Sequence, residues 1–287
     1  MKIDLVYLWV DGADEKWRAK KDAALRRLGR AVPAHSKAGR LFDDGGELKF
    51  SLRSVARFAP WINHIYIITD GQRPKWLATN PRVSVIDHKN IIPKELLPTF
   101  NSNMIEFFIH KIPGLSEHFL YSNDDMFFGR PATPDMFFDD AGRPIVLMGR
   151  GGARDRGIFS DTCENALRYA GAAGWRFKHA IEPMRKSDME AVIDADYETF
   201  RRTTFTPFRE RTNIQRMVIG LANRAGGRGI IRECRRDDCK NIWSLGWNMM
   251  TGMPRTFCIN GTTPLNSFRR NLPAMRRLFP DKSEFEK

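Results

Sequence analysis

The chain has 287 residues, of which 42% are hydrophobic and 11% aromatic, so it is long enough to bury a full core in one large domain or two small ones. Its net charge of +13 indicates an acidic partner, such as nucleotide phosphates, an anionic glycan or the inner face of a membrane. Nucleic acid is not expected, because no nucleic-acid-binding motif is present and aromatic residues do not interleave with the basic clusters.

The first apolar segment, residues 3–10, predicts a buried strand that ends in a turn at Asp11. Asp11 and Asp14 interrupt this segment too early for a signal peptide or a membrane span, and no later segment is apolar enough to span. The four cysteines are too few and too irregularly spaced for a disulfide framework, so we expect Cys234 and Cys239 to be ordinary thiols. These features predict a reduced, cytoplasmic protein, and its charge allows peripheral contact with the inner membrane face.

Helical and strand patterns then alternate as far as residue 129. Residues 31–47 are polar and rich in Gly and Asp, which predicts a loop. Apolar spacing and composition predict helices at 14–30, 48–58, 75–78 and 103–111, and strands at 64–69, 83–86 and 118–121. This alternation predicts an α/β, Rossmann-like fold whose mainly parallel sheet is flanked by helices.

The remainder of the chain is less regular. We expect a basic loop at 149–157, helices at 188–203 and 214–222, and a second basic stretch at 226–238. The last segment alternates turns with short apolar pieces.

Acidic residues follow three of the predicted strands, at Asp11, Asp70 and the triplet Asn123-Asp124-Asp125. In a parallel sheet the ligand crevice lies at the carboxyl ends of the strands. Paired carboxylates suit Mg²⁺, which commonly binds one or two carboxylates together with phosphate oxygens. Acidic turns are also common without any function, so the triplet alone leaves both interpretations open.

Two later residues, His179 and Arg209, also allow both a functional and a structural interpretation. His179 is either a general base of near-neutral pKa or an ordinary surface or core histidine. Arg209 belongs to a charged run that is either a solvated surface or a site for a diphosphate group.

Longer strings resemble the Stealth family, which comprises bacterial capsular and exopolysaccharide sugar-phosphotransferases and the catalytic part of the animal lysosomal-enzyme GlcNAc-1-phosphotransferase. The first string is IDLVYLWVDG, and the second runs through residues 40–129 with LPTFNSNMIE and LSEHFLYSNDDMFFG. A third begins at His179 in RFKHAIEPM and returns at Phe208-Arg209, and a fourth covers residues 256–260. The resemblance covers most of the chain.

This resemblance implies transfer of a hexose 1-phosphate, typically GlcNAc 1-phosphate from UDP-GlcNAc, to a carbohydrate hydroxyl in capsular or exopolysaccharide synthesis, with release of UMP. It also implies a GT-A-like fold, a nucleotide sugar donor, a carbohydrate acceptor and Mg²⁺ or Mn²⁺. We therefore expect a single catalytic domain over residues 1–287. Within it, residues 1–148 would form the nucleotide-sugar-binding core, and residues 149–287 a helical and loop part that completes the active site.

The resemblance also implies roles for individual residues. We expect Asp124 and Asp125 to hold the metal, Arg209 to stabilise the diphosphate, and His179 or Asp125 to accept the proton. The expected catalytic residues are Asp11, Asp124, Asp125, His179 and Arg209, and the expected substrate-binding residues are Arg53, Asp70, Gln72, Asn101, Ser102, Asn123 and Asn260.

The chain departs from the family pattern at three positions. Asn260 is followed by Gly261 where an aspartate is usual, Thr206 replaces a histidine, and Asn213 occupies a later acidic position. Two alternatives therefore stay open: a conventional glycosyltransferase that releases UDP, and a catalytically silent glycan- or nucleotide-binding homologue.

Overall fold

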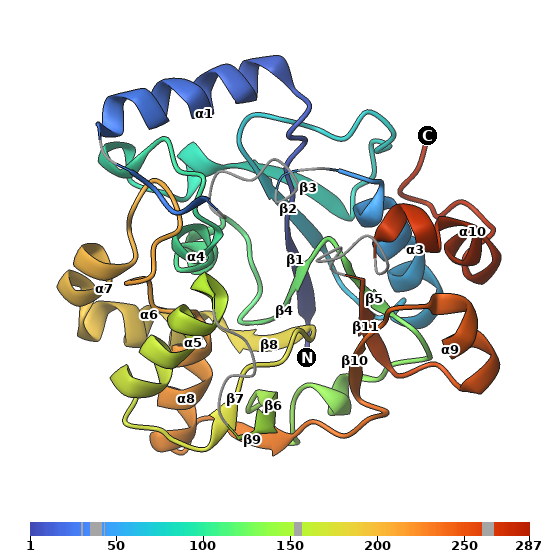
Figure 1. Cartoon of the computed structure of the whole chain (residues 1–287). Helices are drawn as coiled ribbons and strands as arrows, with labels where there is room; N and C mark the ends of the chain where they lie inside the picture. The colour runs from blue at the N-terminus through green and yellow to red at the C-terminus, as the bar shows by residue number, and fades with distance from the viewer. Residues whose placement is uncertain (30, 35–41, 43, 152–156, 260–266) are drawn as a thin grey trace.

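A computed structural model describes the chain except for residues 30, 35–41, 43, 152–156 and 260–266 (Figure 1). At its centre is a five-stranded sheet in the order β3-β2-β1-β4-β8. The first four strands are parallel and the last is antiparallel to β4. Their bounds are β1 (Ile3–Leu8), β2 (Ile65–Thr69), β3 (Val83–Asp87), β4 (His118–Asn123) and β8 (Glu182–Arg185). The predicted α/β fold with a mainly parallel sheet is confirmed.

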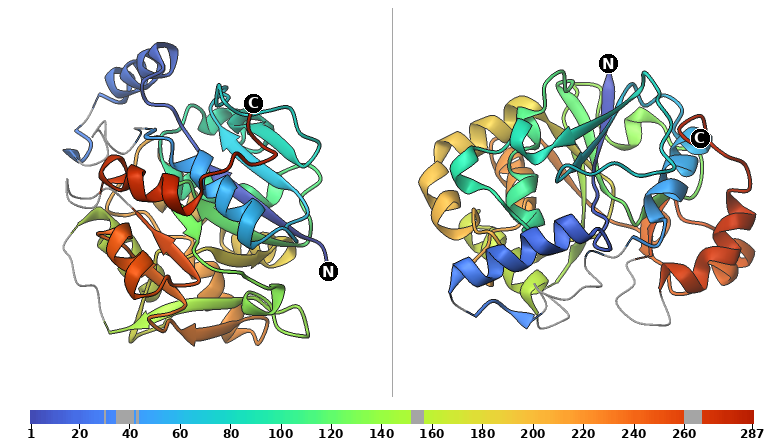
Figure 2. Two further views of the ribbon diagram at one scale, coloured as in Figure 1. Left: turned by 90° about the vertical axis from the view of Figure 1, so that its right-hand side faces the viewer. Right: turned by 90° about the horizontal axis from the view of Figure 1, so that it is seen from above.

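Alternate side chains of the central strands enter two separate hydrophobic cores, as the two-residue period of a strand requires. Val6 of β1 lies in one core, whereas Leu5 and Tyr7 lie in the other. Figure 2 shows α3 (Glu47–Phe58) and α10 (Phe268–Leu278) on one side of the sheet and the helices between residues 158 and 225 on the other. Both faces of the sheet are therefore covered.

The register of the sheet sets the position of the predicted site. Leu8, the last residue of β1, pairs with Ile68 of β2 and with Asn123 of β4. The carboxyl ends of three adjacent strands consequently meet at one edge. Asp11, Asp70 and the triplet that starts at Asn123 follow these ends.

The remaining elements surround this sheet. Two three-stranded sheets have the orders β10-β11-β5 and β7-β6-β9. The other strands are β5 (Met126–Phe128), β6 (Ile145–Arg150), β7 (Trp175–Arg176), β9 (Ile230–Glu233), β10 (Cys239–Asn241) and β11 (Thr256–Cys258). The other α-helices are α1 (Glu15–Leu28), α4 (Ser102–Glu106), α5 (Ile158–Tyr169), α6 (Lys186–Ala195), α7 (Tyr197–Thr203), α8 (Met217–Ala225) and α9 (Leu245–Thr251).

Several boundaries differ from the sequence prediction. The helix expected at 75–78 is a turn that ends in a β-bridge between Leu77 and Glu286. The helix expected at 103–111 divides into α4 and a 3-10 turn, and the one expected at 188–203 divides into α6 and α7. Helices α5, α9 and α10 and strands β5 to β11 were not predicted. The basic loop at 149–157 falls partly outside the described residues.

The expectation of free thiols at Cys234 and Cys239 is wrong, because the two form a disulfide. The turn between them explains the pairing: the Asp238 carboxylate accepts a hydrogen bond from the backbone N–H of Arg235, 2.9 Å away. This bond closes the turn and brings its two ends together. Cys163 and Cys258 are free and buried. No helix within the described ranges is long and apolar enough to cross a membrane.

The C-terminus is fixed to α3 by Arg53. Its guanidinium makes two 2.8 Å hydrogen bonds to the Glu286 carboxylate, which is 2% exposed, and a third of 2.9 Å to the Phe279 carbonyl. This pair connects residues that are 233 positions apart in the chain. Because the guanidinium is occupied by these groups, Arg53 has a structural role here rather than the expected position at a substrate.

We expect Arg53→Met to lower the free energy of unfolding by about 2 kcal/mol, because it leaves the buried Glu286 carboxylate with only the more distant Lys49, 4.0 Å away, as a charged partner. Lys111→Met is the matched control, since Lys111 pairs with Glu190 at 2.9 Å on the exposed surface. The control should cost less than about 1 kcal/mol. Urea unfolding of both variants measures the difference, and equal losses would contradict a structural role for Arg53.

Candidate active site

Backbone hydrogen bonds position Asp11 beyond the end of β1. The Gln72 side chain accepts a hydrogen bond from the Asp11 N–H at 3.0 Å and donates one to the Asp11 carbonyl at 2.9 Å. Gly12 is needed next to it, because a Cβ at this position would lie 2.5 Å from the carbonyl oxygen of Phe42. One Asp70 oxygen is 2.7 Å from Lys20 Nζ, and the other is buried with no hydrogen-bond partner among the described residues. Asp11, Asp70 and Gln72 are thus together, as predicted.

The Asn123-Asp124-Asp125 triplet forms the turn between β4 and β5. Two serines of α3 hold β5 in place: Ser51 Oγ donates to the Met126 carbonyl at 2.5 Å, and Ser54 Oγ accepts from the Phe128 N–H at 3.0 Å. The three residues of the triplet are all half-buried. The sheet and α3 therefore present both carboxylates at the edge where the parallel strands end.

Two further carboxylates lie beside the triplet and were not predicted. Asp44 precedes α3 and accepts a hydrogen bond from the Gly46 N–H at 2.8 Å. Glu47 begins α3 and accepts one from the Gly45 N–H at 2.6 Å. The sequence signal was the acidic stretch DDGGE, which we interpreted only as a loop.

Burial and mutual repulsion raise the pKa values of these carboxyl groups. Burial, and then the charges of Asp125, Glu47 and Asp44, raise the pKa of Asp124 well above its usual range. Burial raises the pKa of Asp125 to about 6. Burial also raises the pKa of Glu47 to about 7, and the charges of Asp44 and Asp125 add to this shift. The cluster therefore favours protons or a bound cation.

The chemistry of the triplet fits a divalent cation. Oδ1 of Asp125 is buried and has no hydrogen-bond partner among the described residues. Such an oxygen is of the ligand type that Mg²⁺ uses, because this ion is commonly held by one or two carboxylates together with substrate phosphates.

A buried arginine, Arg216, organises the opposite part of the site. Its guanidinium lies 2.9 Å from the Glu106 carboxylate, 3.0 Å from that of Glu182, and 4.2 Å from the centroid of the Tyr121 ring. The Tyr121 hydroxyl is in turn 3.0 Å from Glu106 Oε1 and 2.8 Å from Asn123 Oδ1. This network connects α4, β8 and β4 to the triplet. Sequence reasoning missed Glu106, Glu182 and Arg216, since each appears as an ordinary surface charge.

His179 lies against an aromatic pair. Its ring stacks on Phe159 at a centroid distance of 4.8 Å and meets the edge of Phe177 at 5.8 Å. Burial and then the positive charges of Arg216 and Arg209 lower the pKa of His179 to about 4. The imidazole is therefore neutral at neutral pH, and its lone pair can accept a proton.

Arg209 and Ser102 are brought together, as predicted for two site residues. The Arg209 guanidinium donates a 2.6 Å hydrogen bond to Ser102 Oγ. Phe208 supports this segment by stacking on Phe100, with ring centroids 5.2 Å apart. Burial lowers the pKa of Arg209, while the nearby Glu106 charge acts in the opposite direction. A half-buried guanidinium so placed can hold a phosphate group.

Asn101 is fully buried and makes only internal contacts. Its amide donates to the Thr204 and Thr206 carbonyls at 3.0 and 3.1 Å and to Asn213 Oδ1 at 2.9 Å. Asn213 Nδ2 in turn donates to the Thr203 carbonyl at 2.8 Å. An aspartate has no such donor, so the asparagine at position 213 belongs to the network that holds the Arg209 segment. Asn101 therefore holds this segment in position.

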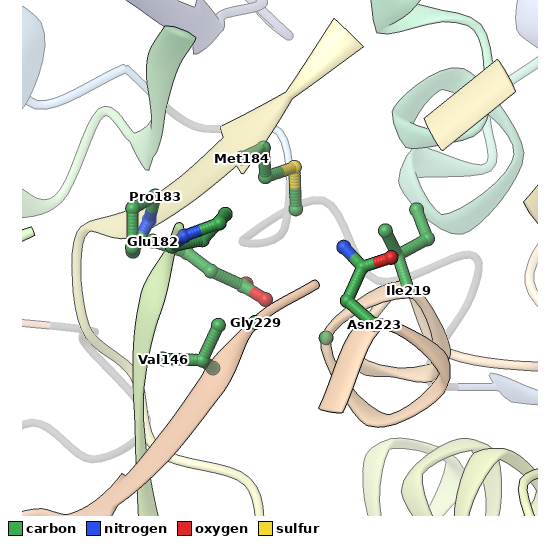
Figure 3. A pocket seen from close by; sticks show the side chains of 9 residues that line it. Val146, Glu182, Pro183, Met184, Ile219, Asn223 and Gly229 are labelled. Atoms are coloured by element: carbon green, nitrogen blue, oxygen red, sulfur yellow. The ribbon is translucent and has the colours of Figure 1, made fainter. Parts of the chain in front are cut away.

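A small internal cavity lies behind the arginine network. Figure 3 shows Glu182 and Asn223 on opposite walls of it. Its volume of about 10 Å³ is the size of one water molecule, so it is too small for a substrate. The structure thus places Asp11, Asp70, Gln72 and the triplet at the sheet edge and joins Arg209 to Ser102. Arg53 instead pairs with Glu286, and the Asn101 amide is used by internal hydrogen bonds. Asn260 and Gly261 lie outside the described residues.

We expect Asp125→Asn to be more stable than the wild type at pH 8 without metal, by on the order of 2 kcal/mol. The pKa of this carboxyl is about 6 in the folded protein and 3.8 in the unfolded chain. Folding therefore favours its protonated form, and the wild type loses stability as the pH rises from about 4 to about 6. At pH 4 the two proteins should be similarly stable.

Thermal unfolding in EDTA at pH 4, 6 and 8 tests this expectation, with the exposed Asp140→Asn as the control. Mg²⁺ should then stabilise the wild type at pH 8 more than it stabilises Asp125→Asn. Parallel pH profiles for the wild type and the Asp125 variant would contradict a pKa of Asp125 that burial raises.

Comparison with known proteins gives matches in two regions. Residues 1–29 match the model of Stealth protein conserved region 1, and residues 41–146 match that of conserved region 2. Among solved structures, the glycosyltransferase GlyE of Streptococcus pneumoniae is 12% identical with a TM-score of 0.42, covering 90% of this chain and 54% of that one. The galactosyltransferase LgtC is also 12% identical with a TM-score of 0.42, and the match covers 94% of this chain and 83% of LgtC.

Curated relatives are more similar in sequence. An exopolysaccharide phosphotransferase of Lactiplantibacillus plantarum is 52% identical over 50% of this chain and 41% of its own length. An exopolysaccharide phosphotransferase of Mycobacterium tuberculosis is 39% identical over 74% of this chain and 42% of its own length. A capsular polysaccharide phosphotransferase of Aeromonas hydrophila is 37% identical over 74% of this chain and 61% of its own length. The chain thus spans less than two thirds of each of these relatives. Together with the two matched regions, these relatives show that the chain belongs to the Stealth family.

Proposed function

We propose that this chain transfers a hexose 1-phosphate from a nucleotide sugar to a carbohydrate hydroxyl, with GlcNAc 1-phosphate from UDP-GlcNAc as the first candidate donor. The observation that carries the proposal is the charge arrangement at the sheet edge. The candidate site contains the Asp124 and Asp125 carboxylates, which favour a bound cation. It also contains the Arg209 guanidinium and a neutral His179. A diphosphate with its metal ion is a ligand class that uses all of these groups.

In the proposed reaction an acceptor hydroxyl oxygen forms a bond to the β-phosphorus of the donor. The bond between that phosphorus and the oxygen bridging to the α-phosphate breaks, and the nucleotide leaves as UMP. Asp124 and Asp125 would hold Mg²⁺ or Mn²⁺, which supplies positive charge to the phosphate oxygens when bound. Arg209, oriented by Ser102, would stabilise the negative charge of the diphosphate.

His179 is the proposed proton acceptor, and Asp125 is the alternative. The lowered pKa of His179 leaves its imidazole neutral at neutral pH with a free lone pair, and it also makes this imidazole a weaker base than an ordinary histidine. Asp11, Asp70, Gln72 and Asn123 surround the ends of β1, β2 and β4, and we assign them to donor binding. Their location follows the rule that ligands bind at the carboxyl ends of parallel strands. A cytoplasmic location, with peripheral contact at the inner membrane face, stays a prediction.

The released nucleotide tests the reaction type. We expect UMP to form from UDP-GlcNAc only when acceptor and Mg²⁺ are both present, and Asp124→Asn to abolish its formation while leaving the circular dichroism spectrum unchanged. Mass spectrometry of the nucleotide product separates the alternatives. Release of UDP would assign the chain as a conventional glycosyltransferase. Donor binding in calorimetry, without product for any metal or acceptor, would indicate a silent binding protein.

Replacing His179 by phenylalanine tests the base. His179→Phe retains an aromatic ring against Phe159 and removes the proton acceptor, so we expect kcat to fall by about 10²-fold or more with donor affinity unchanged. Phe159→Leu is the matched control, since it disturbs the stack and keeps the imidazole. Single-turnover rates with saturating donor measure both variants. A normal rate for His179→Phe would transfer the base role to Asp125.

A further inference from the structure

Two exposed tryptophans lie where the chain enters α9. Trp243 and Trp247 are 72% and 61% exposed, and Met250 of the same helix is 76% exposed. Large apolar side chains at this exposure commonly belong to a binding surface, and tryptophan offers a flat ring with a polar N–H at its edge. In Figure 1, α9 and α10 lie side by side next to the β10-β11-β5 sheet.

A groove of about 360 Å³ separates α9 from α10. Trp243 and Gly246 form one wall, and Arg270 and Arg277 of α10 belong to the other. The buried side chain of Asn271 fixes the two walls together, because its Oδ1 accepts a 2.8 Å hydrogen bond from the Leu245 N–H. The groove is therefore held by the fold and does not depend on surface side chains alone.

The charge of this region is one-sided. Residues 239–280 contain no Asp or Glu, but six basic residues: Lys240, Arg255, Arg269, Arg270, Arg276 and Arg277. Arg270 and Arg277 are exposed, and neither forms an ion pair with another described residue. Two guanidinium groups beside a concave aromatic wall suit a ligand that carries anionic groups along an extended chain.

The groove also has a structural connection to the candidate active site. Strand β11 follows α9 and pairs with β5, the strand that begins next to Asp125. The Ile259 N–H donates a 3.0 Å hydrogen bond to the Asp125 carbonyl. A chain held between α9 and α10 would thus be anchored on the same small sheet as the proposed metal-binding carboxylates.

From these observations we propose that the groove between α9 and α10 binds an anionic glycan whose sugars are joined by phosphodiester links. The inference rests on the proposed function, because hexose 1-phosphate transfer produces such links. The Trp243 ring packs against the apolar face of a sugar, and Arg270 and Arg277 each contact a phosphodiester. We favour a glycan over a lipid surface because Trp243 and both arginines line one groove, whereas the exposed Trp247 and Met250 do not line it.

Binding without donor tests the groove independently of the transfer reaction. The probe is a tetrasaccharide of hexoses joined by 1-phosphodiester links, and the matched neutral ligand has glycosidic links instead. We expect quenching of tryptophan emission by the charged probe only, and weaker binding as salt increases, because salt screens exposed charges. The variants Trp243→Ala and Arg270→Gln/Arg277→Gln should each bind about tenfold more weakly, which corresponds to about 1.4 kcal/mol.

The control variant is Arg201→Gln/Arg202→Gln, which removes the same charge from the exposed surface of α7. It should bind the probe like the wild type, and thermal unfolding should show that all variants are folded. Equal binding by the wild type and the Arg270/Arg277 variant would overturn the proposal. Sedimentation with vesicles of phosphatidylcholine and phosphatidylglycerol, combined with no binding of the tetrasaccharide, would overturn it in favour of a membrane surface.

A kinetic measurement then links the groove to transfer. With the phosphodiester-linked acceptor, Arg270→Gln/Arg277→Gln should raise the acceptor KM about tenfold and leave turnover of a monosaccharide acceptor unchanged. Failure to observe any transfer would contradict the proposed function and leave the binding result intact. An unchanged KM for the long acceptor, together with normal turnover, would contradict only a role of the groove in acceptor binding.

Discussion

Burial of neighbouring carboxylates at one edge of the sheet, together with their mutual repulsion, is the constraint on which the candidate site depends. Parallel strands bring their carboxyl ends together, and Asp44, just before α3, and Glu47, its first residue, lie beside Asp124 and Asp125. Ser51 and Ser54 of α3 hold β5 in place, so the triplet cannot turn away to relieve this repulsion. The remaining ways to relieve it are protonation and cation binding, and a cation shared with a ligand's phosphates relieves it at neutral pH. The same carboxylates that lower the stability of the fold are therefore the groups that can bind such a cation and its ligand.

The arginine network provides charge of the opposite sign without neutralising the carboxylates. Arg216 is paired with Glu106 and Glu182, so its charge is largely satisfied within the core, yet it still helps to lower the pKa of His179. Removing one member of a buried network is costly because the others are left without partners. The same network orients Tyr121, whose hydroxyl meets Asn123 in the triplet. Arg216 thus adds to the effect of burial on the pKa of His179 and supports the strand that presents the acidic turn.

Local patterns predicted the four parallel strands of the central sheet, but not β8, and they placed Asp11, Asp70 and the triplet at strand ends, because strand period and chain alternation are properties of neighbouring residues. They could not predict pairs that are distant in sequence. Glu106 meets Arg216, 110 residues later, and Arg53 meets Glu286 across 233 positions. Without these partners, Arg53 looked available for a substrate. Helix α10 was missed because Pro273 lies inside it and disguises the helical pattern, although Ser267 caps its first turn.

The net charge of +13 has a different meaning once the positions of the charges are known. At the sequence level it indicated an acidic partner, yet the carboxyl ends of the strands are themselves rich in acid. An anionic donor approaching this edge meets repulsion unless a cation is already present or arrives with it. The excess positive charge is concentrated elsewhere, most clearly in residues 239–280, which contain no acidic residue. Positive charge at a distance of this kind raises the local concentration of polyanions at the protein surface, and the effect weakens as salt increases. Division of the surface into an acidic centre and a basic flank is therefore a physical reason for a long anionic glycan to be held beside the candidate active site and not within it.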